Sequence, residues 1–125
     1  MKTRHILPAA LLLACMAPAG AQQRLPGERL FSIQCASCHS PKPGEWHRLG
    51  PNLHGVIGRA AGSAPGMKYS PPFLRAMEGK VWDAELLDRW LANPQSLARG
   101  TTMVYSEPDP GKRRAIIEYL QTLKP

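Results

Sequence analysis

The sequence predicts a small all-α domain. Two stretches, 83–93 and 109–123, place apolar residues three and four positions apart, as one buried face of a helix requires. Few residues are β-branched, which disfavours a sheet. The stretch 40–70 predicts long loops, and long loops in a compact domain are often functional. Something other than side chains could therefore fill the middle of the domain.

The first and last helices are expected to cross each other. The first contains Gly27, which has no side chain and allows another helix to approach closely. The last begins after Asp109, and its apolar side consists of Ile116, Ile117, Leu120 and Leu123. We expect Phe31, Ile116 and Tyr119 to fill the crossing.

Two further helices are expected between these. Ser70 can cap a helix that begins at Pro71, and Asp83 can cap the next one. The second of these has one apolar face, which consists of Leu86, Leu87, Trp90 and Leu91. It must end near Asn93, because Pro94 restricts the backbone of the residue before it.

The N-terminus is typical of a secretory signal peptide. Residues 1–21 combine a basic start, an apolar stretch over 6–17 and small residues before the expected cleavage after Ala21. The mature domain would be residues 22–125, exported to a bacterial periplasm. The apolar stretch is too short to span a bilayer, so we expect no integral membrane anchor.

A lipoprotein signal is the alternative at this end. The letters "LLAC" loosely resemble a lipoprotein box, which would retain Cys15 with an attached lipid. Cleavage after Ala21 instead removes Lys2 and Arg4 and lowers the formal charge from +7 to +5. This charge suits an acidic partner or an anionic membrane surface. No basic run carries interleaved aromatic residues, so nucleic acid is not an expected partner.

The segment "IQCASCHS" carries the most informative chemistry. Cys35 and Cys38 lie three positions apart, and His39 follows at once. A zinc site needs about four ligands, and the mature chain adds only His47 and His54, with no second cysteine pair. A thioredoxin-like redox pair would follow a strand, whereas "PGERLFSIQ" is typical of a helix. The C-x-x-C-H pattern therefore predicts haem c, with both thiols bonded to its vinyl groups and His39 on the iron.

Several segments then resemble the class I cytochromes c of the mitochondrial and bacterial c2 type. In order they are "CASCH", "GPNLHGVIGR", "PGMKYSPPF", "VWDAELLDRWLANP" and "GTTM". The resemblance spans residues 27–123. It implies a cytochrome c domain wrapped around one covalently attached haem, with a role as a one-electron carrier.

An iron with one histidine needs a sixth ligand or keeps an open site, and the candidate ligands are the methionines of the mature chain and His54. Met67 lies in a turn, Met77 in the short helix after Pro71, and Met103 in the irregular run "ARGTTM". The resemblance implies that Met103 is the ligand. A His/Met pair raises the reduction potential and occupies both axial positions. With no position left for a substrate, we expect an electron carrier and not an enzyme.

The resemblance also implies roles around the ring. The carbonyl of Pro51 would accept the second ring proton of His39 and fix its orientation. Arg59, Tyr69 and Trp82 would face the haem propionates, for which a guanidinium, a phenol and an indole are suitable donors.

Thr101 and Trp90 would line the methionine side of the pocket. Trp90 stands where a tyrosine is common, which leaves open whether it bonds to the methionine sulfur. We expect His54 to hold a loop by hydrogen bonding and His47 to be exposed.

An electron carrier needs a redox protein as donor and another as acceptor, such as an oxidase, a reductase or a dehydrogenase. Mitochondrial-type carriers surround the haem edge with lysines. Here the matching positions hold Gln34, Gln95, Ser96 and Thr102, and Arg99 alone stays near the methionine loop. We therefore expect a more apolar and less salt-sensitive contact.

Two other functions remain open on sequence. One is a dedicated haem c subunit of a periplasmic dehydrogenase. The other is a haem enzyme or gas sensor with an open sixth site.

Overall fold

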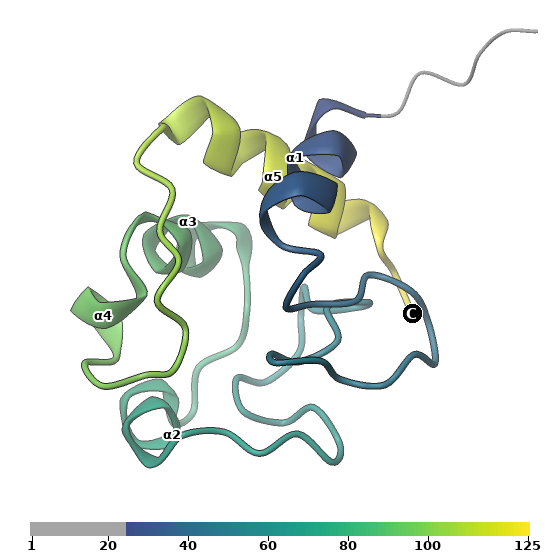
Figure 1. Cartoon of the computed structure of the whole chain (residues 1–125). Coiled ribbons are helices and arrows are strands. Elements are labelled where there is room, and N and C mark those ends of the chain that lie inside the picture. Colours follow the sequence, from purple (N-terminus) through teal and green to yellow (C-terminus); the bar gives the residue numbers. More distant parts are fainter. Residues whose placement is uncertain (1–24) are drawn as a thin grey trace, which may run out of the picture.

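The structure is a computed structural model that describes residues 25–125, coloured in Figure 1. The expected signal peptide, its cleavage after Ala21 and the alternative at Cys15 lie outside these residues. The helices are α1 (Pro26–Gln34), α2 (Pro71–Met77), α3 (Ala84–Ala92), α4 (Pro94–Leu97) and α5 (Pro110–Thr122). Within the described range, the sole β-pairing is an isolated bridge between Ala60 and Val81. The all-α prediction is confirmed.

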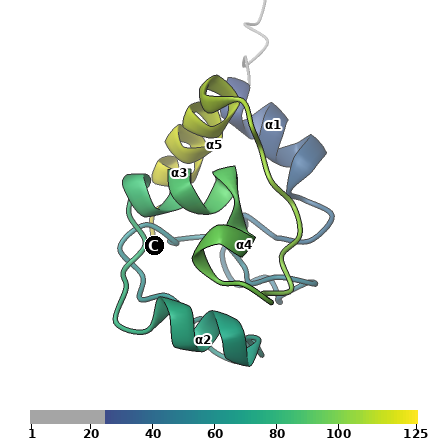
Figure 2. The same cartoon turned by 90° about the vertical axis from the view of Figure 1, so that its left-hand side faces the viewer.

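Helices α1 and α5 cross closely, as expected, and lie side by side in Figures 1 and 2. A Cβ on Gly27 would overlap the carbonyl oxygen of Ala115 and lie 2.6 Å from its carbon. The rings of Phe31 and Tyr119 pack with centroids 5.4 Å apart, and Ile116 is buried beside them. The missing side chain at Gly27 is what permits this approach.

Short polar side chains cap three of the helices, at Ser70 and Asp83 as the sequence predicted and also at Asp109. A side-chain oxygen of Ser70, Asp83 and Asp109 accepts a backbone N–H of the first turn, at 3.4, 2.7 and 2.7 Å respectively. Each bond satisfies a donor that has no partner inside the helix.

The sequence did not predict helix α4. Pro94 ends α3, as expected, but it also occupies the first position of α4, where its missing N–H costs nothing. The Asn93 side chain caps this turn by accepting from the backbone N–H of Ser96 at 3.2 Å. The chain therefore reverses tightly between α3 and the segment that carries Met103.

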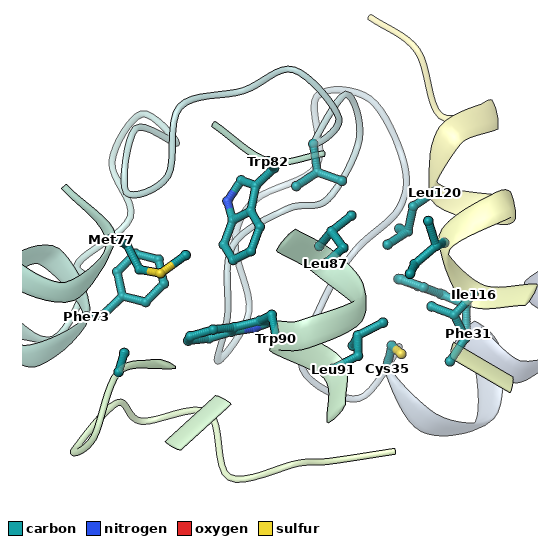
Figure 3. Packing of buried hydrophobic residues seen from close by; sticks show 13 residues of the cluster. Phe31, Cys35, Phe73, Met77, Trp82, Leu87, Trp90, Leu91, Ile116 and Leu120 are labelled. Atoms are coloured by element: carbon teal, nitrogen blue, oxygen red, sulfur yellow. The ribbon is translucent and has the colours of Figure 1, made fainter. Parts of the chain in front are cut away.

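The buried residues form one cluster, and we call its two ends the two groups. Figure 3 shows an aromatic group with Phe73, Met77, Trp82 and Trp90, and a second group with Phe31, Cys35, Leu91, Ile116 and Leu120. Figure 2 shows α1 and α5 at one end of the molecule and α2 at the other, with α3 and α4 between them. A cavity of about 450 Å³ is lined by members of both groups. The expected space in the middle of the domain is therefore present.

The helices of residues 25–125 are all too short or too polar to cross a membrane.

We predict that Gly27→Ala lowers the free energy of unfolding by about 1–3 kcal/mol, the usual cost of an overpacked contact. The new methyl group must push α1 away from Ala115. Denaturant unfolding of the haem-loaded protein measures the effect. Ser32→Ala, an exposed change in the same helix, should stay within about 0.5 kcal/mol of the original chain. Equal stability of the two variants would contradict the tight crossing.

Candidate haem site

All the site residues predicted from the sequence line one cavity of about 450 Å³. They are Cys35, Cys38, His39, Pro51, Arg59, Tyr69, Trp82, Thr101 and Met103. Most of them lie in loops, so the helices serve to hold the ends of these loops around a common space. The cavity is mainly apolar, and its size falls within the range of ligand and cofactor pockets.

The C-x-x-C-H segment continues directly from α1. Backbone N–H groups of Cys38 and His39 donate to the carbonyl of Cys35 at 3.0 and 2.9 Å, which forms one more turn beyond the helix. This turn holds the two thiols and the imidazole in fixed relative positions at the wall of the cavity.

The His39 imidazole is oriented by Pro51, as the resemblance implied. Its Nδ1 lies 2.7 Å from the carbonyl oxygen of Pro51. Because a carbonyl oxygen can only accept, Nδ1 carries the proton and Nε2 keeps a free lone pair. Burial is the main cause that lowers the pKa of His39, which favours the neutral form that a metal requires.

Gly50 is a site residue that the sequence prediction did not single out. A Cβ at this position would overlap the His39 ring and lie 2.8 Å from each ring nitrogen. The Gly50 N–H also donates to the carbonyl of Cys38 at 2.9 Å. The glycine directly before Pro51 was the signal in the sequence that could have identified this contact. A backbone packed against the His39 ring has no room for a side chain.

The two cysteines fit neither of the alternative chemistries. Cys35 and Cys38 form no disulfide, and burial, with a smaller contribution from Cys38, raises the pKa of Cys35 to about 11. A redox-active pair needs a lowered thiol pKa. Residues 25–125 contain no group of three or more His, Cys, Asp or Glu side chains that could hold a metal ion. A neutral thiol facing an apolar cavity fits a covalent tether.

Of the three methionines within residues 25–125, Met103 and Met67 line the cavity. Met77 is 1% exposed and packs in the aromatic group of Figure 3 instead. The Trp90 indole N–H donates to the sulfur of Met103 at 3.0 Å. The sequence left open whether Trp90 bonds to the methionine sulfur, and the structure shows that it does.

Arg59 and Trp82 are brought together by backbone pairing. The Trp82 N–H donates to the carbonyl of Arg59 at 3.0 Å, next to the bridge between Ala60 and Val81. The Arg59 guanidinium is half-buried and donates to the carbonyl of Asn52 at 2.9 Å. Burial lowers its pKa, and its remaining N–H donors can serve an anionic group in the cavity.

Tyr69 stands on the same side of the cavity. Its ring stacks on Phe73 with centroids 5.0 Å apart. Its hydroxyl oxygen accepts from the backbone N–H of Ala64 at 3.3 Å, so the hydroxyl proton points elsewhere. Arg59, Tyr69 and Trp82 therefore form a suitable donor set for carboxylates.

Of the two loop histidines, His47 differs from the expectation. His47 is not fully exposed, because its Nε2 donates to the carbonyl of Pro65 at 2.7 Å and its Nδ1 accepts from the Asn52 N–H at 2.9 Å. His47 therefore joins two loops. His54 contributes its backbone, which bonds to Asn52 and Arg59. In the sequence both histidines simply lie in loops. Only the structure, in which two of these loops lie in contact, shows that His47 joins them.

A buried carboxylate, Glu107, was also missed. It accepts from the Gln34 amide at 3.2 Å, the Tyr105 hydroxyl at 3.3 Å and the Asp109 N–H at 3.0 Å. Gln34 and Tyr105 both line the cavity. Burial and the neighbouring carboxylate raise the pKa of Tyr105 above its usual range, which keeps the hydroxyl protonated as a donor.

Comparisons with known proteins agree on one group. No model of a protein family matches the chain. It is 41% identical over 99 residues to cytochrome c2 of Rhodopila globiformis, which covers 78% of this chain and 91% of that protein. It is 36% identical over 96 residues to cytochrome c of Ginkgo biloba, covering 76% and 83%. The solved cytochrome c2 of Rhodospirillum centenum has a TM-score of 0.73 and 33% identity, covering 79% of this chain and 96% of that one.

We predict that Gly50→Ala displaces the His39 imidazole and lowers stability by about 1–3 kcal/mol, because the methyl group and the ring cannot share the same space. Absorption and electron paramagnetic resonance spectra of the ferric holoprotein would show a changed axial field. Gly44→Ala is the matched control, since it strains a backbone with φ of 71° but places no Cβ within 4 Å of other atoms. Unaltered spectra in Gly50→Ala would contradict the close contact.

Proposed function

Because this chain belongs to the class I c-type cytochromes, we propose that it serves as an electron shuttle between redox proteins in a bacterial periplasm. Like its family, it is a monohaem electron carrier with one covalently attached haem c. The observation that carries our residue assignment is the convergence of the C-x-x-C-H segment and Met103 on a single cavity.

We assign the haem tether to Cys35 and Cys38, and the axial ligands to His39 and Met103. When bound, the haem supplies the one-electron chemistry by changing between the ferric and ferrous states of its iron. Nε2 of His39 is free to ligate, because the ring proton is on Nδ1, which donates to the carbonyl of Pro51. Trp90 supports Met103 over Met67, because its bond to the sulfur orients the thioether.

The other predicted residues would hold the ring and its acidic groups. Arg59, Tyr69 and Trp82 would donate to the propionates, which are costly to bury without hydrogen bonds. Thr101, which is buried, would close the methionine side against water. With both axial positions taken, no substrate can reach the metal, and we propose that the protein is not an enzyme.

The proposed compartment rests on the N-terminal sequence. A basic start, an apolar stretch and small residues before Ala21 support export with cleavage at that point. A lipid on Cys15 is the minority alternative. In this compartment the electron donor and acceptor would be an oxidase, a reductase or a dehydrogenase. A fixed dehydrogenase subunit would use the same residues.

The proposed docking face is the rim of the cavity, which we define as its exposed lining residues Leu49, Lys68, Thr102 and Val104. Leu49 is 80% exposed and Val104 is 85% exposed. Lys68 is the only charged member. Gln34 and Gln95 replace lysines of mitochondrial-type carriers, and both amides bond inward instead of facing solvent. Two strongly exposed apolar side chains and a single charge on this rim support a partner with an apolar contact surface.

We predict that Met103→Ala abolishes the near-infrared charge-transfer band of the ferric protein, whereas Met67→Ala keeps it. Loss of the thioether should lower the reduction potential by on the order of a hundred millivolts, since axial ligands set this quantity over a wide range. Near-infrared absorption and potentiometry measure both effects. The assignment fails if Met103→Ala keeps the band, and retention in Met103→Ala with loss in Met67→Ala would identify Met67 as the ligand.

We also predict that electron transfer to the native partner slows less than about tenfold between low and physiological salt, because strong electrostatic steering contributes about 10- to 1,000-fold. Val104→Ser and Leu49→Ser should slow the reaction at every salt concentration. Val81→Ser is the control, since Val81 is exposed but does not line the cavity. A steep fall with salt that disappears in Arg99→Ala would show that a basic patch governs docking instead.

A further inference from the structure

One glutamine organises the segment that carries Met103. The side-chain amide N–H groups of Gln95 donate to the carbonyl oxygens of Thr101 at 2.8 Å and Met103 at 3.2 Å. Its side-chain oxygen accepts from the Gly100 N–H at 2.9 Å. A single amide therefore satisfies three backbone groups within four consecutive residues.

This segment has little other support of its own. Residues 100–103 belong to no helix, and their chain turns at Gly100, where φ is 88°. One local bond, from the Thr101 N–H to the carbonyl of Ala98 at 2.9 Å, links the segment back to the end of α4. The Gln95 side chain replaces the regular backbone ladder that a helix would provide.

Gln95 is itself held at a fixed point. It lies in α4, which begins at Pro94 and is capped by the Asn93 side chain. Pro94 is buried, and α4 packs on α3. The amide therefore reaches the Met103 segment from a rigid base, in the partly buried space between α4 and the loop.

Met103 is thus held at two places from two different helices. Trp90 of α3 bonds to its sulfur at 3.0 Å, and Gln95 of α4 bonds to its carbonyl oxygen at 3.2 Å. The first bond directs the side chain and the second fixes the backbone from which it extends. Neither bond alone would determine where the sulfur lies.

We propose that Gln95 is a positioning residue for the sixth haem ligand, and that it controls how often Met103 leaves the iron; this rests on the proposed role of Met103. Opening of the segment breaks the bonds that Gln95 makes with Thr101 and Met103. Net loss of each internal hydrogen bond shifts such an equilibrium by about two- to tenfold. An external ligand can reach the iron only in the open form, so its binding rate reports the opening.

The chemistry requires an amide in particular. A carboxylate could still accept from the Gly100 N–H, but it could not donate to Thr101 or Met103. Protonation of that carboxylate would restore one donor. A leucine would keep most of the volume and remove all three bonds.

The experiment compares imidazole binding to the ferric holoprotein of the original chain with that of Gln95→Leu and Gln95→Glu. We expect both variants to bind about tenfold faster at neutral pH, from the loss of two or three hydrogen bonds. In Gln95→Glu, the rate relative to the original chain should fall on acidification, because the protonated carboxyl donates again. Purely structural damage would not be reversed by a proton.

Two controls separate positioning from general destabilisation. Gln121→Glu makes the same chemical change at an exposed site in α5, and Ile117→Val weakens the core away from the cavity lining. Neither should bind imidazole faster. Rates within about twofold of the original chain in both Gln95 variants, or equal acceleration in Ile117→Val, would overturn the proposal. Failure of the ligand assignment itself is seen separately, as a charge-transfer band that survives Met103→Ala.

Discussion

The central constraint on this fold is a cavity that its own side chains do not fill. A space of about 450 Å³, lined by both groups of buried residues, would cost a free energy comparable to the whole stability of a small domain if it stayed empty. The haem therefore serves as part of the core. Covalent attachment through the proposed tether, Cys35 and Cys38, would keep the haem bonded to the chain. The crossing of α1 and α5 at Gly27 and the aromatic group around Trp82 then pack at opposite ends of one shared centre.

The proposed iron ligands His39 and Met103 lie outside the helices, and hydrogen bonds from backbone and side chains hold them in place. Pro51 orients the His39 ring, with Gly50 flat against it. Trp90 and Gln95 fix Met103. In each case the atom that restrains the ligand comes from a segment at least eight residues away. Small changes in how these segments pack would therefore shift the proposed ligands of the iron.

The local parts of this structure could be predicted, and the long-range polar contacts could not. The caps at Ser70, Asp83 and Asp109 depend on residues two or three positions away, so a short window of sequence contains the whole cause. The cysteine pair and His39 are equally local, and the resemblance supplied the distant residues of the cavity. Glu107 and His47 gave no such signal, because their partners Gln34 and Pro65 lie far along the chain. The sequence did not predict α4, because a proline after a helix indicates the end of that helix and does not by itself show that a new helix begins there.

The side chains that contact Met103 have a chemical property in common. In the described part of the chain, its two side-chain hydrogen-bond partners are the Trp90 indole and the Gln95 amide. A thioether sulfur can only accept, so a phenol at this position would lose its bond to the sulfur on ionising, whereas an indole N–H keeps its proton. An amide likewise gains or loses no proton in the ordinary pH range. The sulfur and the backbone carbonyl of Met103 thus each keep their bond at any pH at which the fold persists. A methionine held in this way suits a carrier whose iron site must stay constant while its charge changes.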